Sequence, residues 1–323
     1  MSILVYTEHI NGKLKKQSSE LVSYAYQVAK TGSKKVIAVA TGDIQKEELE
    51  KLSVYGASKI IHINSPQLQI LDNQLYTKVL AEIAVKENAQ MVVMANSFKG
   101  KALAPRLAIR LKAGLLTGVV ELPESSDNEK FKKVIFNGKA FAHIKVNTTM
   151  KVITLNNNAC QIQENPVEAE WEEFTPQIAE SNVKTRQLEI DENISGSMLT
   201  EASIVVSGGR GMRSPDNWGP LEELAQTLNA ALACSKPVSD EGWRPHEEHV
   251  GQTGKTIAPD LYIAAGISGA VQHLAGVSSS KTIVAINTDK EAPIFEIADY
   301  GIIGDAIEVL PKFIQSVKKL QAS

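Results

Sequence analysis

Short apolar runs alternate with segments of helical periodicity through the first half of the chain. The runs favour buried strands, and they cover residues 3–6, 35–40, 59–63 and 91–94. The periodic segments place apolar residues three and four positions apart, as amphipathic helices do, and they cover residues 19–29, 71–86 and 101–111. Alternation of this kind is typical of βαβ units and predicts a doubly wound, mainly parallel sheet.

Further strands are predicted at the end of this first half. Residues 132–136, 139–146 and 149–155 are strand-like and follow one another closely in the chain. Asn137-Gly138 is a hairpin signal between the first two, because both residues tolerate the positive φ angles of a tight turn. We therefore expect a β meander of three strands that extends the first domain.

A glutamate-rich segment separates the two halves of the chain. Residues 160–200 gather acidic side chains and end in Ser195-Gly196-Ser197, which predicts a connection between domains. Trp171 and Phe174 are poor linker residues, so part of this connection is expected to pack. We place the boundary near Met198, with an N-terminal domain of residues 1–198 and a C-terminal domain of residues 199–323.

The α/β alternation restarts after this boundary. The predicted strands are residues 203–207, 260–265 and 282–287, and the predicted helices are residues 218–231, 269–275 and 305–320. A chain of 323 residues exceeds the usual size of one hydrophobic core. We predict two α/β domains with mainly parallel, doubly wound sheets, of which the first is Rossmann-like with extra strands.

Composition and charge narrow the range of partners. Hydrophobic residues make up 43% and charged residues 22% of the chain, the balance of an ordinary globular protein. A net charge of −3 offers no basic surface for a phosphate backbone or an anionic lipid layer. Small molecules or other proteins are the expected partners, and nucleic acid is not.

The cysteines and the N-terminus bear on the compartment. Cys160 and Cys234 show no CxxC spacing, so neither a disulfide framework nor a cysteine metal site is predicted. No run approaches the roughly 18 apolar residues of a membrane span. Residues 1–6 read directly as a strand, with no targeting sequence seen. A reducing, cytoplasmic location is the expectation.

Glycine-rich turns follow two strands of the predicted second domain. Residues 207–211 read Ser-Gly-Gly-Arg-Gly, and residues 266–273 open the next predicted helix. Such turns lie at the carboxyl edge of a parallel sheet, where backbone N–H groups favour anions. Arg210 suits a phosphate cradle, but a tight turn with a solvated arginine explains it equally well. The spacing departs from G-x-G-x-x-G, so the pattern alone leaves both open.

Two further motifs fail on spacing. Residues 251–256 resemble a P-loop, but the glycine required five positions before Gly254 is His249, so no NTPase is predicted. His246 and His249 are three apart, without the four-residue spacing of a zinc helix, and a solvated turn is favoured. His273 by itself reads as a partly buried, hydrogen-bonded histidine.

Three runs in the second half carry a family resemblance. They read VVSGGRG at 205–211, VGQTGKTIAPDLYIAAGISGAVQHLAG at 250–276 and KTIVAINTDKEAPIFEIADYGIIGD at 281–305. These runs closely resemble the C-terminal FAD domain of electron transfer flavoprotein alpha subunits, and the match covers residues 203–310. The N-terminal half resembles the family more loosely, including residues 103–108.

The resemblance implies a set of FAD contacts. The pyrophosphate and adenosine portions would be held by Arg210, Ser235, Asn287 and Asp305, with Ala306 beside the last. The ribityl chain and the isoalloxazine would be lined by Val250, Gly251, Gln252, Thr253, Ser268, Gly269, Ala270, Val271, Gln272 and His273. The family places the threonine near flavin N5 and the histidine near the C2 carbonyl. Lys236 stands where the family usually has arginine, which keeps the charge and loses the planar geometry.

The resemblance also implies a role and partners. The chain would be an electron carrier with one noncovalent FAD, paired with a beta subunit that holds AMP. Acyl-CoA or other dehydrogenases would donate electrons, as in fatty acid β-oxidation, and a quinone oxidoreductase would accept them. The alternative is a flavin- or nicotinamide-dependent oxidoreductase with its own substrate, although no clustered acid/base set supports it. A regulatory nucleotide-binding first domain is a third reading, but its Gly42 and Gly100 turns lack a phosphate motif.

Overall fold

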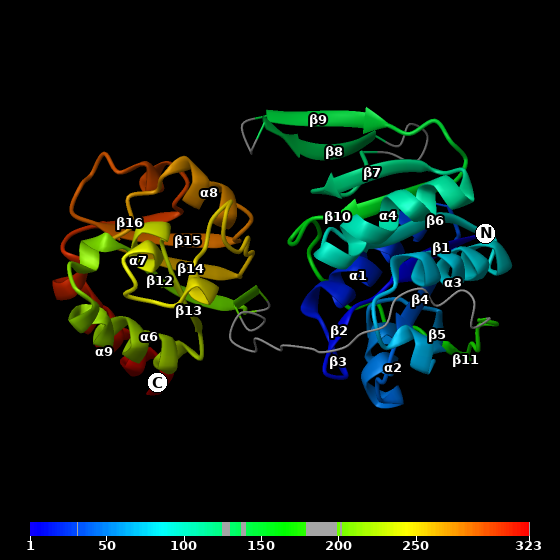
Figure 1. The fold of residues 1–323 in the computed structure, drawn as a ribbon, viewed down its shortest axis with the longest axis horizontal. Coiled ribbons are helices and arrows are strands. Elements are labelled where there is room, and N and C mark those ends of the chain that lie inside the picture. Colours follow the sequence, from blue (N-terminus) through cyan, green and yellow to red (C-terminus); the bar gives the residue numbers. More distant parts are fainter. Residues whose placement is uncertain (31, 125–129, 137–139, 179–198, 201, 323) are drawn as a thin grey trace. The chain divides into compact units, whose positions relative to one another are not determined.

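The computed structural model describes residues 1–30, 32–124, 130–136, 140–178, 199–200 and 202–322 (Figure 1). The chain forms two compact units, residues 1–190 and 191–323, which are described separately below. Two α/β units agree with the predicted fold class. The predicted boundary at Met198 lies outside the described residues and stays a prediction.

Unit 1 contains a nine-stranded sheet among its described residues, in the order β11-β5-β4-β1-β6-β10-β7-β8-β9. The strands are β1 Ser2–Tyr6, β4 Lys35–Thr41, β5 Lys59–Ile63, β6 Ala89–Ala95, β7 Gly114–Val119, β8 Lys130–Ile135, β9 Ala140–Lys145, β10 Lys151–Leu155 and β11 Glu170–Glu173. Pairing is parallel from β11 to β7 and antiparallel from β7 through β9. A small hairpin, β2 His9–Ile10 with β3 Lys13–Leu14, follows β1.

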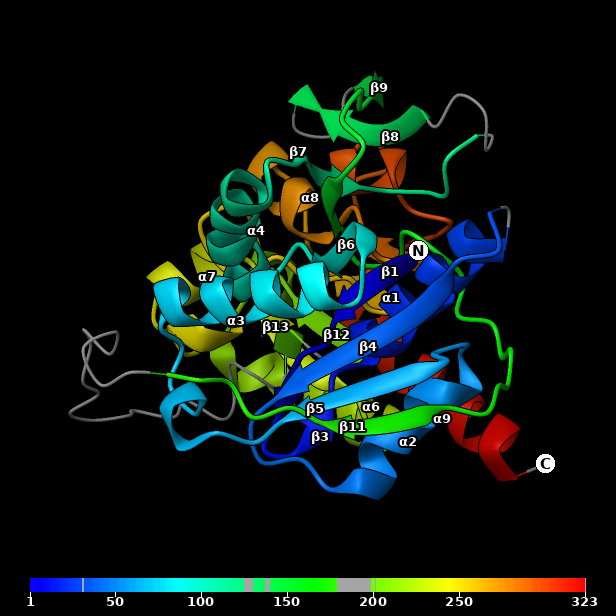
Figure 2. The same ribbon diagram turned by 90° about the vertical axis from the view of Figure 1, so that its right-hand side faces the viewer.

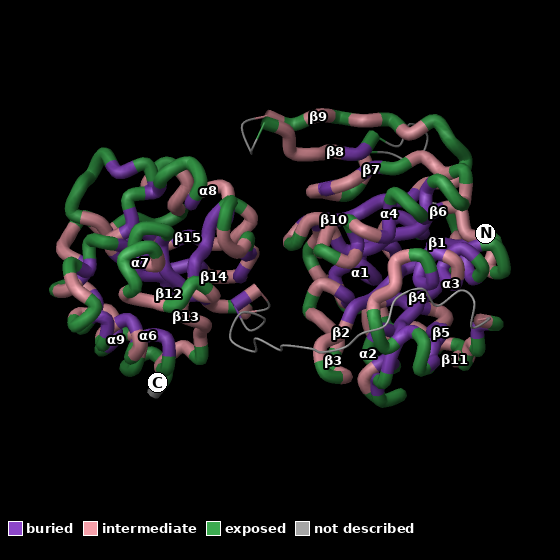
Figure 3. The backbone as a smooth tube through the Cα atoms, viewed as in Figure 1, coloured by how far each residue is buried: buried purple, intermediate pink, exposed green. Residues whose placement is uncertain are grey.

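Helices cover both faces of this sheet. The helices are α1 Lys16–Lys30, α2 Lys46–Val54, α3 Asn73–Lys86 and α4 Phe98–Leu111, with a short 3-10 turn η1 at Pro66–Leu68. The core residues of α1 and α2 form one apolar cluster with the sheet, and those of α3 and α4 form another. Figure 2 shows α3 and α4 side by side, and Figure 3 shows the buried central strands between the helix layers. The predicted doubly wound arrangement is confirmed.

The predicted meander is wrong in its third strand. Strands β8 and β9 form the expected antiparallel pair, while the Asn137-Gly138 turn lies outside the described residues. Strand β10 leaves them and inserts between β6 and β7, parallel to both. Val152 and Ile153 are fully buried there, each in a different one of the two apolar clusters, as suits a central strand.

Part of the acidic segment packs on unit 1, as predicted. Strand β11 pairs with β5, and Trp171 and Phe174 contact the two apolar clusters. Lys59 anchors this edge, because its ammonium lies 2.8 Å from Glu172 and 2.9 Å from Glu87. Burial acts against the charge of Lys59, but its carboxylate partners raise its pKa overall.

Unit 2 contains a smaller, fully parallel sheet in the order β13-β12-β14-β15-β16. The strands are β12 Ile204–Gly208, β13 Ala231–Cys234, β14 Leu261–Ala265, β15 Thr282–Asn287 and β16 Tyr300–Ile303. The helices are α6 Gly219–Leu228, α7 Lys236–Asp240, α8 Val271–Val277 and α9 Ala306–Ala322, with 3-10 turns η4 Arg210–Met212, η5 Pro215–Trp218, η6 His246–Glu248 and η7 Pro293–Glu296. Helices α6 and α9 share one apolar cluster, and α8 lies over the other.

The helix predicted over residues 218–231 ends early. Helix α6 stops at Leu228, where Asn229 adopts the left-handed conformation with φ +50° and caps the helix. The chain then enters β13, a strand that the sequence pattern merged with the helix. This correction matters for the site, because the predicted contact Ser235 follows β13.

Candidate functional site

The carboxyl edge of the unit 2 sheet has a topological switch point. Strand β12 pairs with β13 on one side and with β14 on the other. The connection from β12 therefore leads to one side of β12, and the connection from β13 leads across to the other side. The turns that follow β12 and β14 meet there. The N–H of Gly209 donates to Ala265 O at 2.9 Å, and that of Gly211 donates to Gly266 O at 2.9 Å. Ligands of open α/β sheets bind in this kind of crevice.

Close contact between the backbones of the two turns requires glycine at these positions. A Cβ on Gly209 would lie 2.2 Å from Gly266 O, and one on Gly211 would lie 2.6 Å from Gly266 Cα. Gly266 itself has φ +65°, which favours glycine. The glycines of residues 207–211 therefore hold two turns together, which was the simpler of the two sequence readings.

The loop after β14 presents free backbone donors. The N–H groups of residues 268–272 make no hydrogen bond within the described part of the chain. Two contacts hold the loop in place: the Asn287 side-chain amide donates to Ile267 O at 2.8 Å, and the Ile294 N–H donates to Ser268 O at 3.0 Å. Gly269 at φ +85° makes the turn. A row of free donors on a fixed loop suits an anionic ligand.

Residues 250–253 lie against the same loop. The Val250 N–H donates to Cys234 O at 3.0 Å, and the Gln252 N–H donates to Gln272 O at 2.7 Å. A Cβ on Gly276 of α8 would lie 2.5 Å from Gly251 Cα, so the two segments touch through glycine. Three predicted groups of contacts, at residues 207–211, 250–253 and 268–273, are thus brought to one edge of the sheet.

The predicted contacts near β13 differ in exposure. Arg210 is 67% exposed, and its guanidinium lies 3.9 Å from the Glu241 carboxylate. Ser235 is buried after β13, and its N–H donates to Gly208 O at 3.1 Å. Lys236 is the exposed first residue of α7. The charged groups can therefore move toward a ligand, while the serine is fixed.

The predicted contacts after β15 and β16 already have structural partners. Asp305 accepts from the Ile307 N–H at 3.0 Å, capping α9, and pairs with Arg213. Ala306, 3% exposed, begins that helix. Sequence reasoning missed Arg213, because nothing in its surroundings distinguishes it from an ordinary surface arginine.

His273 is buried beneath the loop that precedes it. Its side chain is 6% exposed and its Nε2 lies 2.8 Å from the Tyr262 hydroxyl. Burial lowers the pKa of His273 to about 4, although the Val250 carbonyl acts in the opposite direction. The imidazole is therefore neutral at pH 7 and can offer a hydrogen bond but no positive charge.

Two family models match the chain. The "Electron transfer flavoprotein domain" matches residues 3–184, and the "Electron transfer flavoprotein FAD-binding domain" matches residues 198–278. Relatives named electron transfer flavoprotein subunit alpha match over nearly the whole length. The protein of Bacillus subtilis (strain 168) is 36% identical and that of Mycobacterium leprae (strain TN) 39% identical, each over 98% of both chains. A mitochondrial relative from Dictyostelium discoideum is 34% identical over 98% of this chain and 91% of its own.

The chain belongs to the electron transfer flavoprotein alpha-subunit family. Its role is that of an electron carrier, which replaces the alternative of an oxidoreductase with its own substrate. The resemblance inferred from residues 203–310 is confirmed and extends to unit 1. No helix in the described part of the chain is long and apolar enough to cross a membrane.

The site of this electron transfer flavoprotein subunit fits FAD. The loop residues 268, 270, 271 and 272 are exposed, as are Gln252 and Thr253, so the edge is open to a large ligand. The free N–H groups can donate to ligand oxygens, and the guanidinium of Arg210 is exposed. Among the described residues, no group of three or more His, Cys, Asp or Glu side chains is placed to hold a metal ion.

Proposed function

We propose that this chain pairs with a beta subunit and holds one FAD noncovalently at the carboxyl edge of the unit 2 sheet. The heterodimer relays electrons from dehydrogenases, such as acyl-CoA dehydrogenases, to a quinone oxidoreductase in the cytoplasm. The row of free N–H groups at residues 268–272, fixed beside the switch point of the FAD-binding domain, carries the proposal. The beta subunit contributes AMP.

Each side chain has a limited task in this site. Arg210 approaches the pyrophosphate, since its existing contact with Glu241 is long and solvent-exposed. Asn287 orients the loop: its amide donates to Ile267 O and its carbonyl oxygen accepts from the Asp289 N–H at 3.0 Å. Asp305 acts in the same indirect way through the start of α9.

Bound FAD supplies the electron-transfer chemistry, and the chain positions it. His273 is the neutral hydrogen-bonding partner on this edge, whereas Lys236 is an exposed cation. A cation near the flavin favours its reduced, negatively charged form. Lys236 is therefore the residue here that can supply positive charge at the position the family fills with arginine.

The proposal is tested on the protein co-produced with its beta subunit. Absorbance spectra and chromatography of the released cofactors should give one FAD and one AMP per heterodimer. A crystal structure should place the FAD on unit 2. A dimer without flavin, or a flavin held by unit 1 alone, would contradict the site.

The relay role needs a separate assay. Flavin reduction should require a dehydrogenase together with its substrate, and the reduced protein should pass electrons on to a quinone oxidoreductase. Two FADs and no AMP per heterodimer would instead indicate that the partner holds a second flavin. Turnover of a small substrate by the heterodimer alone would contradict the carrier role.

A further inference from the structure

Unit 1 has a cavity of about 700 Å³ at the carboxyl edge of its own sheet. Strand β1 pairs with β4 on one side and β6 on the other, so the cavity lies at a second topological switch point. Its walls come from the β2–β3 hairpin, the end of β4, the turn η1 and helices α2, α3 and α4. None of the residues assigned to FAD lines it. Its volume is within the usual range of small-molecule sites.

Hydrogen bonds hold the wall formed by the β2–β3 hairpin and the end of β4. His9 Nε2–H donates to Thr41 O at 2.9 Å, and its Nδ1 accepts from the Gly12 N–H at 3.3 Å. Gly42 has φ +102°, and a Cβ there would lie 2.7 Å from His9 Nε2. Tyr76 of α3 is tied to the Leu68 carbonyl. These polar groups already hydrogen-bond within the protein, so they define the shape of the cavity. A ligand would be recognised by the charged residues of the lining.

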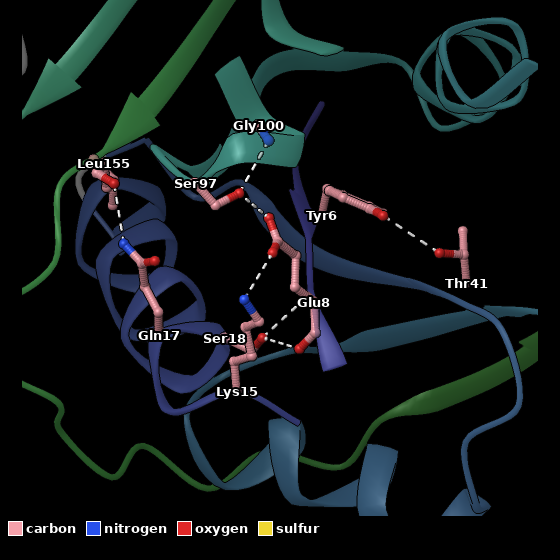
Figure 4. A network of polar contacts seen from close by, with 9 residues as sticks. All are labelled: Tyr6, Glu8, Lys15, Gln17, Ser18, Thr41, Ser97, Gly100 and Leu155. Carbon is pink, nitrogen blue, oxygen red and sulfur yellow. Dashed lines mark hydrogen bonds and ion pairs between the residues drawn. The ribbon is translucent and has the colours of Figure 1, made fainter. Parts of the chain in front are cut away.

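A buried carboxylate fixes the start of α4 (Figure 4). Glu8 is 4% exposed, accepts from the Ser97 hydroxyl and lies 3.4 Å from the Lys15 ammonium. Ser97 in turn caps α4 by accepting from the Gly100 N–H at 3.0 Å. Figure 4 shows Ser97 between Glu8 and Gly100. The carboxylate of Glu8 is therefore already satisfied by Ser97 and Lys15.

Lys99 lines the cavity without a partner. Its side chain is partly buried, yet it makes no hydrogen bond or ion pair with any residue that the structure describes. It is the second residue of α4, where the helix dipole also disfavours a cation. Burial and the charge of Lys15 hold the pKa of Lys99 below its usual value, although Glu8 acts the other way. By contrast, Lys51 on the same cavity pairs with Glu48.

A second wall, at the start of α2, carries hydrogen-bond acceptors. Asp43 precedes α2, Gln45 is its N-cap, and Glu47 is in its first turn. A ligand that satisfies both walls carries an anionic group for Lys99 and hydroxyl or amino donors for the carboxylates. We propose that this cavity binds a small phosphate ester bearing hydroxyl groups, with its phosphate paired to Lys99. The turns at Gly42 and Gly100 lack a phosphate motif, so the sequence alone does not reveal this site.

The test uses the heterodimer and isothermal titration with ribose 5-phosphate and with AMP. Lys99→Met removes the proposed phosphate contact, and Lys101→Met is the control, since Lys101 is an exposed lysine of α4 outside the cavity. Loss of one charged contact should weaken binding roughly tenfold to a hundredfold in Lys99→Met. Lys101→Met should bind as the parent does. Equal affinity in both variants, or no binding of either probe at millimolar concentration, overturns the proposal.

The two probes distinguish a sugar phosphate from a nucleotide. The partner subunit is expected to hold AMP as well. Only the part of AMP binding that is lost in Lys99→Met is therefore assigned to the cavity. Lys99 has no partner to lose, so Lys99→Met should melt no lower than the parent without ligand and should gain no stabilisation from ribose 5-phosphate. A variant that ribose 5-phosphate still stabilises as much as the parent also overturns the proposal. FAD content, which depends on unit 2, should stay unchanged in all variants.

Discussion

At the residue scale, His273 shows what the sequence motif leaves open. The motif and the family resemblance place it beside the flavin, whereas its burial and its contact with Tyr262 are those of a packed residue. Its contact with the flavin stays a prediction. The motif could not reveal the depressed pKa, because that depends on burial of the ring and, to a lesser extent, on Val250 and His249, which are distant in the chain.

His273 should make the protein sensitive to acid. Its folded pKa of about 4 lies below the ordinary 6.5, so between these values the unfolded state binds a proton that the folded state does not. Stability is therefore lost as pH falls from about 6.5 toward 4. Between pH 7.5 and 5 the parent should lose about 2 kcal/mol more than His273→Gln, by chemical denaturation at each pH. Parallel pH profiles would show that the folded-state imidazole titrates normally.

Arg210→Ala should weaken FAD retention. Losing one charged hydrogen bond to the pyrophosphate costs about 1.5–3 kcal/mol, which is roughly a tenfold to hundredfold loss of affinity. The flavin potential should stay unchanged, because the pyrophosphate is distant from the ring. Fluorescence titration of the FAD-free heterodimer measures the affinity, and Arg110→Ala, at an exposed arginine of unit 1, is the control. Equal affinity in parent and Arg210→Ala would remove Arg210 from the site.

At the element scale, most strands and helices follow from the sequence pattern, and two misassignments have physical causes. Strand β10 is a short apolar run that suits an edge or a central position equally, and its partners β6 and β7 are chosen by tertiary packing. Strand β13 is made of small apolar residues that also favour a helix. Asn229, a residue that tolerates the left-handed conformation, was the available signal that α6 ends before it.

The contact between the two glycine turns predicts a steric effect. In Gly209→Ala the new Cβ would lie 2.2 Å from Gly266 O, so the turns after β12 and β14 must separate. Both the melting temperature and the FAD content of the heterodimer should fall. Gly32→Ala is the control, because the nearest neighbours of its Cβ would be atoms of the flexible Lys34 side chain, from 3.2 Å. A Gly209→Ala protein with normal stability and FAD content would show that this contact is dispensable.

At the scale of the whole molecule, the assignment of FAD to unit 2 predicts that FAD stabilises one unit and not the other. Bound ligand stabilises the unit that contains its contacts, by an amount that grows with ligand concentration over Kd. Hydrogen exchange of the heterodimer with and without FAD should therefore show added protection at the ends of β12, β14 and β15. Strands β1 and β4 of unit 1 should exchange at unchanged rates. Equal protection in both units would mean that FAD acts on the whole subunit.

The insertion of β10 also has a consequence for synthesis of the chain. Strands β6 and β7 leave the ribosome before β10, which pairs with both of them. Each therefore keeps one unpaired edge until residues 151–155 follow, after the β8–β9 pair. The nascent chain must hold two unpaired strand edges meanwhile, and such edges invite pairing with other chains. Ribosome-bound fragments that stop before residue 151 should therefore need chaperones more than fragments that continue past residue 155.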